Sequence, residues 1–126
     1  MENIVSFLET IQKITEKDTR YKTEVYTFVM EALDFTVSKL KEPRHVTGQE
    51  LLEGIREYGI KQFGPMTRTV FEYWGVKSTE DFGEIVFNMV DNGLMDKTEH
   101  DSKDDFKNGY DFREVFDKGY RYELNI

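Results

Sequence analysis

Apolar residues recur at intervals of three and four along most of the chain, the spacing that places side chains on one face of a helix. This pattern predicts five helices, near residues 3–16, 22–41, 48–63, 66–74 and 79–92. The first of them has an apolar stripe made of Ile4, Phe7, Leu8, Ile11 and Ile14.

The predicted helix ends coincide with capping residues. Thr47-Gly-Gln-Glu50 has the form of a capping box, in which the Thr47 hydroxyl and the Glu50 carboxylate each accept a backbone N–H. Gly64-Pro65 ends the third helix and begins the fourth, because glycine tolerates the left-handed conformation and proline fits a first turn. The later boundaries are marked by Gly75, Ser78 and Gly93.

Beyond Leu94 the helical spacing fades, and the pattern favours two short strands, 94–100 and 106–112, around a charged loop. The predicted class is therefore mainly α with a small C-terminal β-hairpin (α+β). In this interpretation a winged-helix-like core of three helices plus wing, residues 44–112, follows a pair of N-terminal helices within 1–41. An aromatic C-terminal tail, 113–126, completes a single domain of 1–126.

Composition narrows the chemistry of this chain of 126 residues. It has no cysteine, which excludes disulfides, zinc–thiolate sites and cysteine nucleophiles. Charged residues interrupt the apolar positions of the N-terminus, so no signal peptide is predicted, and no apolar stretch is long enough for a transmembrane helix. We expect a cytoplasmic protein without membrane contact.

The charge pattern argues against nucleic acid as a partner. The 17 basic and 25 acidic residues give a net charge of −8, which repels phosphate backbones. The fifth predicted helix would be the recognition helix of a winged-helix protein, and it has four carboxylates but no lysine or arginine. Its carboxylates are candidate contacts for a basic protein surface, although a merely solvated face accounts for them as well: Glu80, Asp81, Glu84 and Asp91.

No catalytic, cofactor or metal motif is present. The acidic stretch after residue 96 does not fit a calcium loop, because a frame that starts at Asp104 places Phe106 at a ligand position and one that starts at Asp101 places Lys103 there. We therefore predict no cofactor, no metal and no catalytic residue, and His45 is interpreted as a local hydrogen-bonding residue. One helix start offers a candidate anion site formed by Gly64, Met66, Thr67 and Arg68.

Long strings of the sequence resemble a family of small, uncharacterised bacterial proteins. The resemblance rests on RHVTGQELLEGIREYGIKQFGP (44–65) and VFEYWGVKSTEDFGEIVFNMVDNGL (70–94), with EVYTFVMEALDFTV (24–37) before them and KTEHDSKDDFKNGYDF (97–112) after them. It implies a bacterial cytosolic origin and similar domain boundaries. It implies no activity, because that family has no assigned cofactor or catalytic residue.

Three classes of function are left open by the sequence. The leading hypothesis is a non-catalytic interaction or regulatory module that binds another protein or a second copy of itself. The second is a nucleic-acid-associated regulator that uses a surface other than the acidic helix. The third is an enzyme whose site has no recognisable motif. An apolar patch rimmed by charge would favour the first class. Salt-dependent DNA binding would favour the second, and a pocket of carboxylates with strongly shifted pKa values the third.

Overall fold

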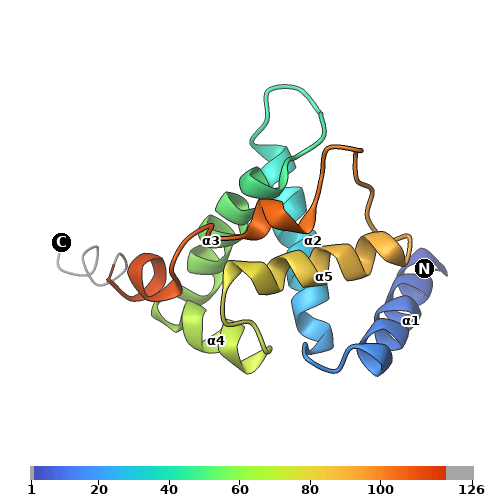
Figure 1. Ribbon diagram of the computed structural model, residues 1–126, viewed down its shortest axis with the longest axis horizontal. Helices are drawn as coiled ribbons and strands as arrows, with labels where there is room; N and C mark the ends of the chain where they lie inside the picture. Colours follow the sequence, from blue (N-terminus) through green and yellow to red (C-terminus); the bar gives the residue numbers. More distant parts are fainter. Residues whose placement is uncertain (1, 119–126) are drawn as a thin grey trace.

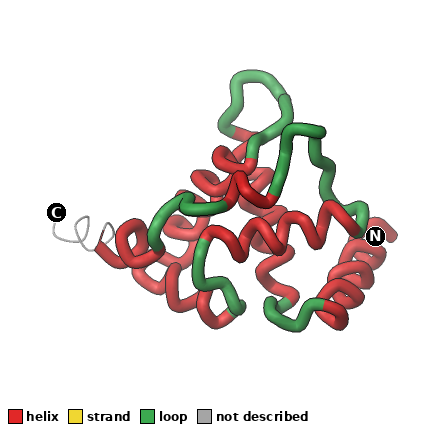
Figure 2. Tube along the Cα trace, viewed as in Figure 1, coloured by secondary structure: helices red, strands yellow, loops and turns green. Residues whose placement is uncertain are grey.

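The computed structural model describes residues 2–118, and within this range all regular structure is helical (Figures 1 and 2). Five α-helices form the body, and three short helical turns complete it. The elements in chain order are α1 (Glu2–Lys17), α2 (Thr23–Ser38), α3 (Gly48–Phe63), η1 (Gly64–Met66), α4 (Thr67–Tyr73), α5 (Thr79–Asp91), η2 (Lys103–Phe106) and η3 (Arg113–Lys118).

The five α-helices lie where the apolar spacing predicts them. The capping box at the start of α3 is complete, with the Glu50 N–H donating to Thr47 Oγ1 at 3.1 Å and the Thr47 N–H donating to Glu50 Oε1 at 3.0 Å. One detail differs from the prediction: of the apolar stripe on α1, only Ile11 and Ile14 are fully buried.

Helix α2 runs through the middle of the molecule and packs against α1, α3 and α5 (Figure 1). An aromatic cluster fills the space beside it, with Phe71 of α4 at its centre. The partner rings have their centroids between 5.2 and 6.1 Å from that of Phe71 and come from α2, α4, α5 and the C-terminal segment: Phe28, Trp74, Phe82, Phe112 and Phe116. Because these rings come from distant parts of the sequence, they join all of these segments to one core.

The packing of α2 against α3 depends on a glycine. A methyl group at Gly54 would overlap the hydroxyl of Thr36, which donates to the Ala32 carbonyl at 2.7 Å. A second glycine sets the turn between α4 and α5. Gly75 has φ +96, and its backbone lies against the Arg20 carbonyl, so both the conformation and the space favour glycine there.

The predicted C-terminal hairpin is wrong. No strand occurs in residues 2–118, so the α+β class and the wing of the winged-helix interpretation are both incorrect. Residues 94–102 form an irregular loop, and the second predicted strand, 106–112, is replaced by the end of η2, a turn at 107–108 and an irregular segment (Figure 2).

Side chains explain why this region needs no strand partner. The Asp105 carboxylate accepts the Ser102 N–H at 3.0 Å and so starts a helical turn at the position assigned to a loop. The hydroxyl of Thr79, buried on α5, donates to the Phe106 carbonyl at 2.6 Å and accepts the Gly109 N–H at 3.1 Å. These contacts satisfy two backbone groups of the second predicted strand without a partner strand.

The segment after η2 returns to the core. Phe112 and Phe116 are buried, and the Tyr110 hydroxyl donates to the Leu52 carbonyl at 2.8 Å. The remaining aromatic residues of the predicted tail, Tyr120 and Tyr122, lie outside the described residues.

We predict that Thr47→Ala lowers the free energy of unfolding by about 0.5–2 kcal/mol, because the Glu50 N–H loses its acceptor. Urea unfolding measures the change. Thr69→Ala, at an exposed position of α4, serves as the control and should leave the transition midpoint in place. Equal midpoints for the parent and Thr47→Ala would contradict the capping box.

We predict that Gly54→Ala destabilises the protein although alanine is favoured over glycine in helices by about 1 kcal/mol. The added methyl must displace Thr36 or push α2 and α3 apart. The same change should cost less in a Thr36→Ala background, where the hydroxyl is absent, so a double-mutant cycle measures the contact. Equal effects in both backgrounds would exclude this explanation.

Candidate functional site

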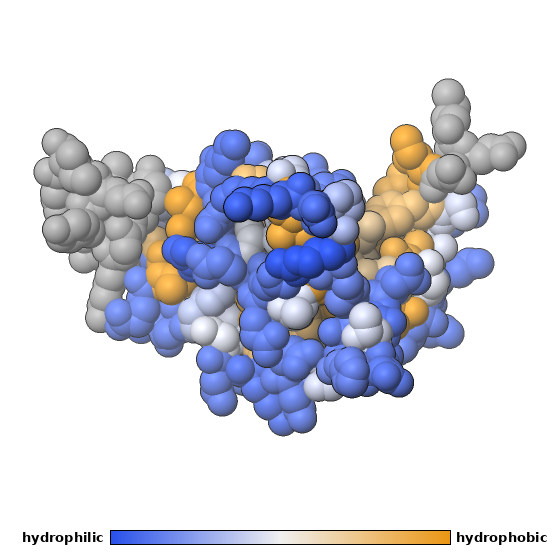
Figure 3. All heavy atoms as spheres, turned by 90° about the horizontal axis from the view of Figure 1, so that it is seen from above, coloured by the Kyte–Doolittle hydropathy of each residue, from blue (hydrophilic) through white to orange (hydrophobic). Residues whose placement is uncertain are grey.

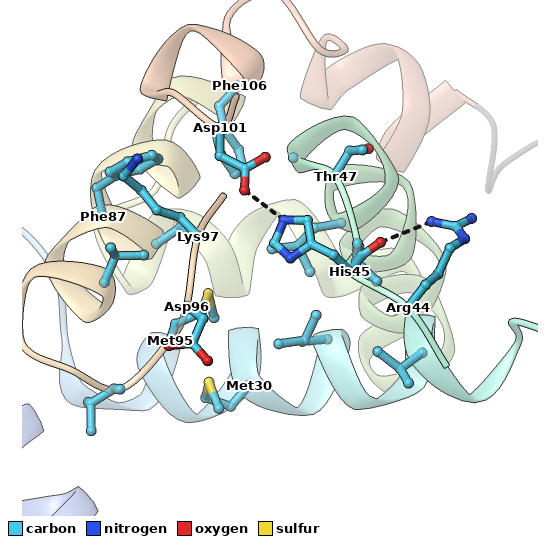
Figure 4. Close-up of a pocket in the computed structure, with 18 residues that line it drawn as sticks. Met30, Arg44, His45, Thr47, Phe87, Met95, Asp96, Lys97, Asp101 and Phe106 are labelled. Atoms are coloured by element: carbon cyan, nitrogen blue, oxygen red, sulfur yellow. Dashed lines mark hydrogen bonds and ion pairs between the residues drawn. The ribbon is translucent and has the colours of Figure 1, made fainter. Parts of the chain in front are cut away.

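A pocket of about 330 Å³ opens between α2, the start of α3, α5 and the loop that follows α5 (Figure 4). Its volume lies at the lower end of the range of small-ligand sites. The lining is mainly apolar, with residues from all four segments: Met30, Leu33, Val37, Val46, Leu51, Val86, Phe87, Val90, Leu94, Met95 and Phe106. Two flexible methionines among them allow the walls to adapt to differently shaped groups.

The walls follow from the helical register and from one buried ring. On α5, Val86 and Val90 are four residues apart and share a face, as do Leu33 and Val37 on α2. Phe106 of η2 packs against two glycines, Gly48 on α3 and Gly83 on α5, which leave room for its ring. Its ring and Cβ come within 3.1 Å of the Cβ position of Gly48 and 3.0 Å of that of Gly83.

Polar side chains at the mouth join the two loops that border the pocket. His45 Nε2 lies 2.6 Å from Asp101 Oδ2, and the same oxygen accepts the Thr98 N–H at 2.8 Å (Figure 4). Asp101 therefore links the segment before α3 to the loop after α5. The second nitrogen of the His45 ring makes no hydrogen bond within the part of the chain that the structure describes.

Electrostatics favours the charged form of this carboxylate. Burial raises the pKa of the Asp101 carboxyl, but the Thr98 N–H and the His45 ring outweigh this, and the net pKa lies below its ordinary value.

A carboxylate on the first turn of α3 is bound to an arginine that lines the pocket. The Arg44 guanidinium binds Glu50 at 2.9 and 2.7 Å and, together with the Thr47 N–H, lowers the Glu50 pKa to about 2. Arg44 is thus neutralised locally.

Two charged residues at the mouth have no ionic partner in residues 2–118. Lys97 Nζ donates only to the Thr98 carbonyl at 3.1 Å, and Asp96 forms no ion pair or hydrogen bond there. Asp96 and Lys97 both line the pocket, where the first can accept and the second can donate a hydrogen bond (Figure 4).

The polar groups at the mouth include a hydrogen-bonded imidazole and carboxylate and a hydroxyl that is used in a helix cap. The His45–Asp101 pair resembles the orienting half of a catalytic triad, yet the described chain places no hydroxyl in hydrogen-bonding contact with the second ring nitrogen. The nearby Thr47 hydroxyl is engaged in the capping box. Within residues 2–118 no group of three or more His, Asp or Glu side chains is arranged to hold a metal ion.

The structure divides the acidic residues predicted as an interaction face. Asp81 accepts the Tyr21 hydroxyl at 2.6 Å and the Lys77 N–H at 2.8 Å, and burial together with this carboxylate raises the Tyr21 pKa. Glu84 binds Lys103 at 2.9 Å and lies 3.5 Å from Arg20. Only Glu80 and Asp91 are exposed, near opposite ends of α5.

The predicted anion site is occupied by the protein's own groups. Arg68 binds Asp117 at 2.9 Å and Glu72 at 3.0 Å, so its guanidinium already has two carboxylate partners. The Thr67 hydroxyl is buried and donates to the carbonyls of Gly59 and Gly64. Gly64 and Met66 lie in the turn η1.

The sequence does not reveal the pocket, because His45 and Asp101 lie 56 positions apart in the chain and no local pattern connects them. One local signal was available. The spacing of Ser102 and Asp105 repeats that of Thr47 and Glu50, and it would have placed a helical turn after Asp101.

Comparison of the chain with protein-family models, with curated proteins and with solved structures finds no match in any of the three. None of the helices in residues 2–118 combines the length and the apolar composition that crossing a membrane requires.

We predict that acid weakens the contact by which Asp101 joins the loop after α5 to the segment before α3. Because the folded-state pKa of Asp101 is depressed below 3.8, its contribution to stability is present above the unfolded-state pKa and is lost as the pH falls through the folded-state value. Carboxyl NMR should give a pKa below 3.8, and Asp101→Asn should flatten the acid limb of the unfolding free energy. Asp91→Asn removes the same charge from an exposed position and is the control. An Asp101 pKa at or above 3.8 would contradict the link.

Proposed function

We propose that this protein is a non-catalytic interaction module whose pocket between α2, α3 and α5 receives an apolar side chain from a partner protein. The observation that carries the proposal is the combination of an apolar interior with a charged mouth. Partner recognition commonly uses an apolar anchor that enters such a pocket while polar groups around it fix the orientation.

The mouth of the pocket supports a peptide segment as the occupant. A backbone that crosses the mouth has both N–H donors and C=O acceptors. Asp96 offers an acceptor and Lys97 a donor, and neither has an ionic partner within the described chain. The interior has room for a large side chain such as Leu, Met or Phe, with the methionines adjusting around it.

A bacterial cytosolic origin and a relationship to the family of small, uncharacterised proteins are part of the same proposal. They rest on the long strings within residues 20–116. The acidic groups of α5 are less suited to the contact than the sequence suggests, because Asp81 and Glu84 already have partners inside the protein.

We predict that filling the pocket blocks peptide binding. Peptides selected from a displayed random library on the parent protein should bind the Val90→Trp variant at least about tenfold more weakly, because the indole takes the place of the anchor. Val70→Trp makes the same change at a partly buried position outside the pocket and is the control. Binding is measured by calorimetry.

Replacing the shared apolar residue of the selected peptides by alanine should have an effect of similar size. Peptides that bind the parent and a folded Val90→Trp variant equally, or that share no apolar residue, would refute the pocket as the site.

A further inference from the structure

Helix α1 carries an apolar surface that the rest of the described chain leaves uncovered. Its C-terminal half is held in the core by Ile11 and Ile14, but its N-terminal half exposes Ile4 by 64%, Val5 by 50% and Leu8 by 52%. Seen from above, hydrophobic side chains gather at the end of the molecule where α1 lies (Figure 3). Three large apolar groups exposed on one helix form a patch rather than scattered single residues.

This patch continues into a groove between α1 and α2. The groove is lined by Leu8, Ile11 and Gln12 on α1 and by Thr23, Glu24 and Thr27 on α2. At 100° per residue, Ile4, Leu8 and Gln12 follow one another along one side of α1. An elongated apolar strip that opens into a groove has the shape that accepts a helix.

The charges that border the strip are acidic. Glu9 and Glu16 flank it on α1, and Glu24 borders the groove on α2. Glu9, Glu16 and Glu24 form no ion pair in residues 2–118. Glu24 accepts the Thr23 hydroxyl and its own backbone N–H, and Lys22 lies near enough to favour its charged form. Lys13 and Lys17 are five and nine residues from Leu8, which places them 140° and 180° around the helix and away from the strip.

We infer that this face of α1, with the groove beside it, binds a basic amphipathic helix of a partner protein. The apolar side of that helix covers Ile4, Val5 and Leu8, while its lysines or arginines reach Glu9, Glu16 and Glu24. Opposite charges around an apolar centre steer such a partner and speed association.

The same charges select against the other occupants of an apolar face. A second copy would bring its own Glu9 and Glu16 against those of the first. A membrane with anionic lipids repels a chain with a net charge of −8. The site is separate from the pocket of the proposed function, since the two share no lining residue.

The test uses the full chain and a short amphipathic helical peptide of leucine and lysine, with a leucine–glutamate peptide of the same pattern as its partner control. We expect the lysine peptide to bind, the glutamate peptide not to bind, and binding to weaken with added salt. The triple variant Ile4→Gln, Val5→Gln, Leu8→Gln should lose about tenfold or more in affinity. Met66→Gln with Tyr73→Gln alters other exposed apolar residues and should bind like the parent.

A charge variant distinguishes electrostatic attraction of the lysine peptide from non-specific apolar binding. Glu9→Gln, Glu16→Gln and Glu24→Gln together should weaken binding of the lysine peptide and reduce its salt dependence. Removing three carboxylates elsewhere, by Glu80→Gln, Asp91→Asn and Glu99→Gln, changes the net charge equally and should have a smaller effect.

Three results would overturn the inference. The first is equal binding of the lysine and glutamate peptides, and the second is equal effects of the two charge variants. The third is a different occupant, shown by a dimer that the apolar variant abolishes in sedimentation equilibrium or by α1-dependent binding to phosphatidylcholine vesicles. Val90→Trp leaves this binding unchanged, so failure here and failure of the pocket proposal are distinguishable.

Discussion

The position of Phe106 determines how the second half of the chain is arranged. Its ring occupies the space that two glycines leave open, Gly48 on the first turn of α3 and Gly83 on α5. The Thr79 hydroxyl donates a hydrogen bond to the Phe106 carbonyl. With this ring fixed, the loop after α5 must pass over the ends of α2 and α3 to reach it. That route produces the pocket and brings the two loops at its mouth together.

Local sequence signals were sufficient to predict the α-helices, but they did not predict the path of the loop after α5. A capping box such as Thr47–Glu50 involves residues three apart, so the sequence displays it directly. The contacts that replace the expected hairpin join residues that are distant in the chain. Thr79 serves backbone groups 27 and 30 residues away, and Asp101 meets His45 across 56 residues. The pattern in 94–112 therefore favoured strands, whereas in the structure the Thr79 side chain binds two backbone groups of the second one.

The sequence also does not show which carboxylates have partners inside the protein. The carboxylates on α5 look alike in the sequence, yet Asp81 caps the helix and binds Tyr21 while Glu84 is neutralised by Lys103 and Arg20. A carboxylate with an internal partner adds little to the attraction of an external one. Carboxylates that form no ion pair within residues 2–118 lie elsewhere, at Glu9, Glu16 and Glu24, and only the folded chain reveals this difference.

The two apolar openings of the molecule differ in what they can recognise. The pocket has an apolar interior and a mouth of balanced charge, so the proposed partner would be selected by the size and shape of a single side chain. The strip on α1 is exposed and has Glu9 and Glu16 beside it, so the inferred partner would be selected by charge and by the length of its apolar helix face. Because they lie on different helices, one partner that reached both would gain effective concentration at the second after binding the first. A small domain can thus combine two modest contacts into one specific association.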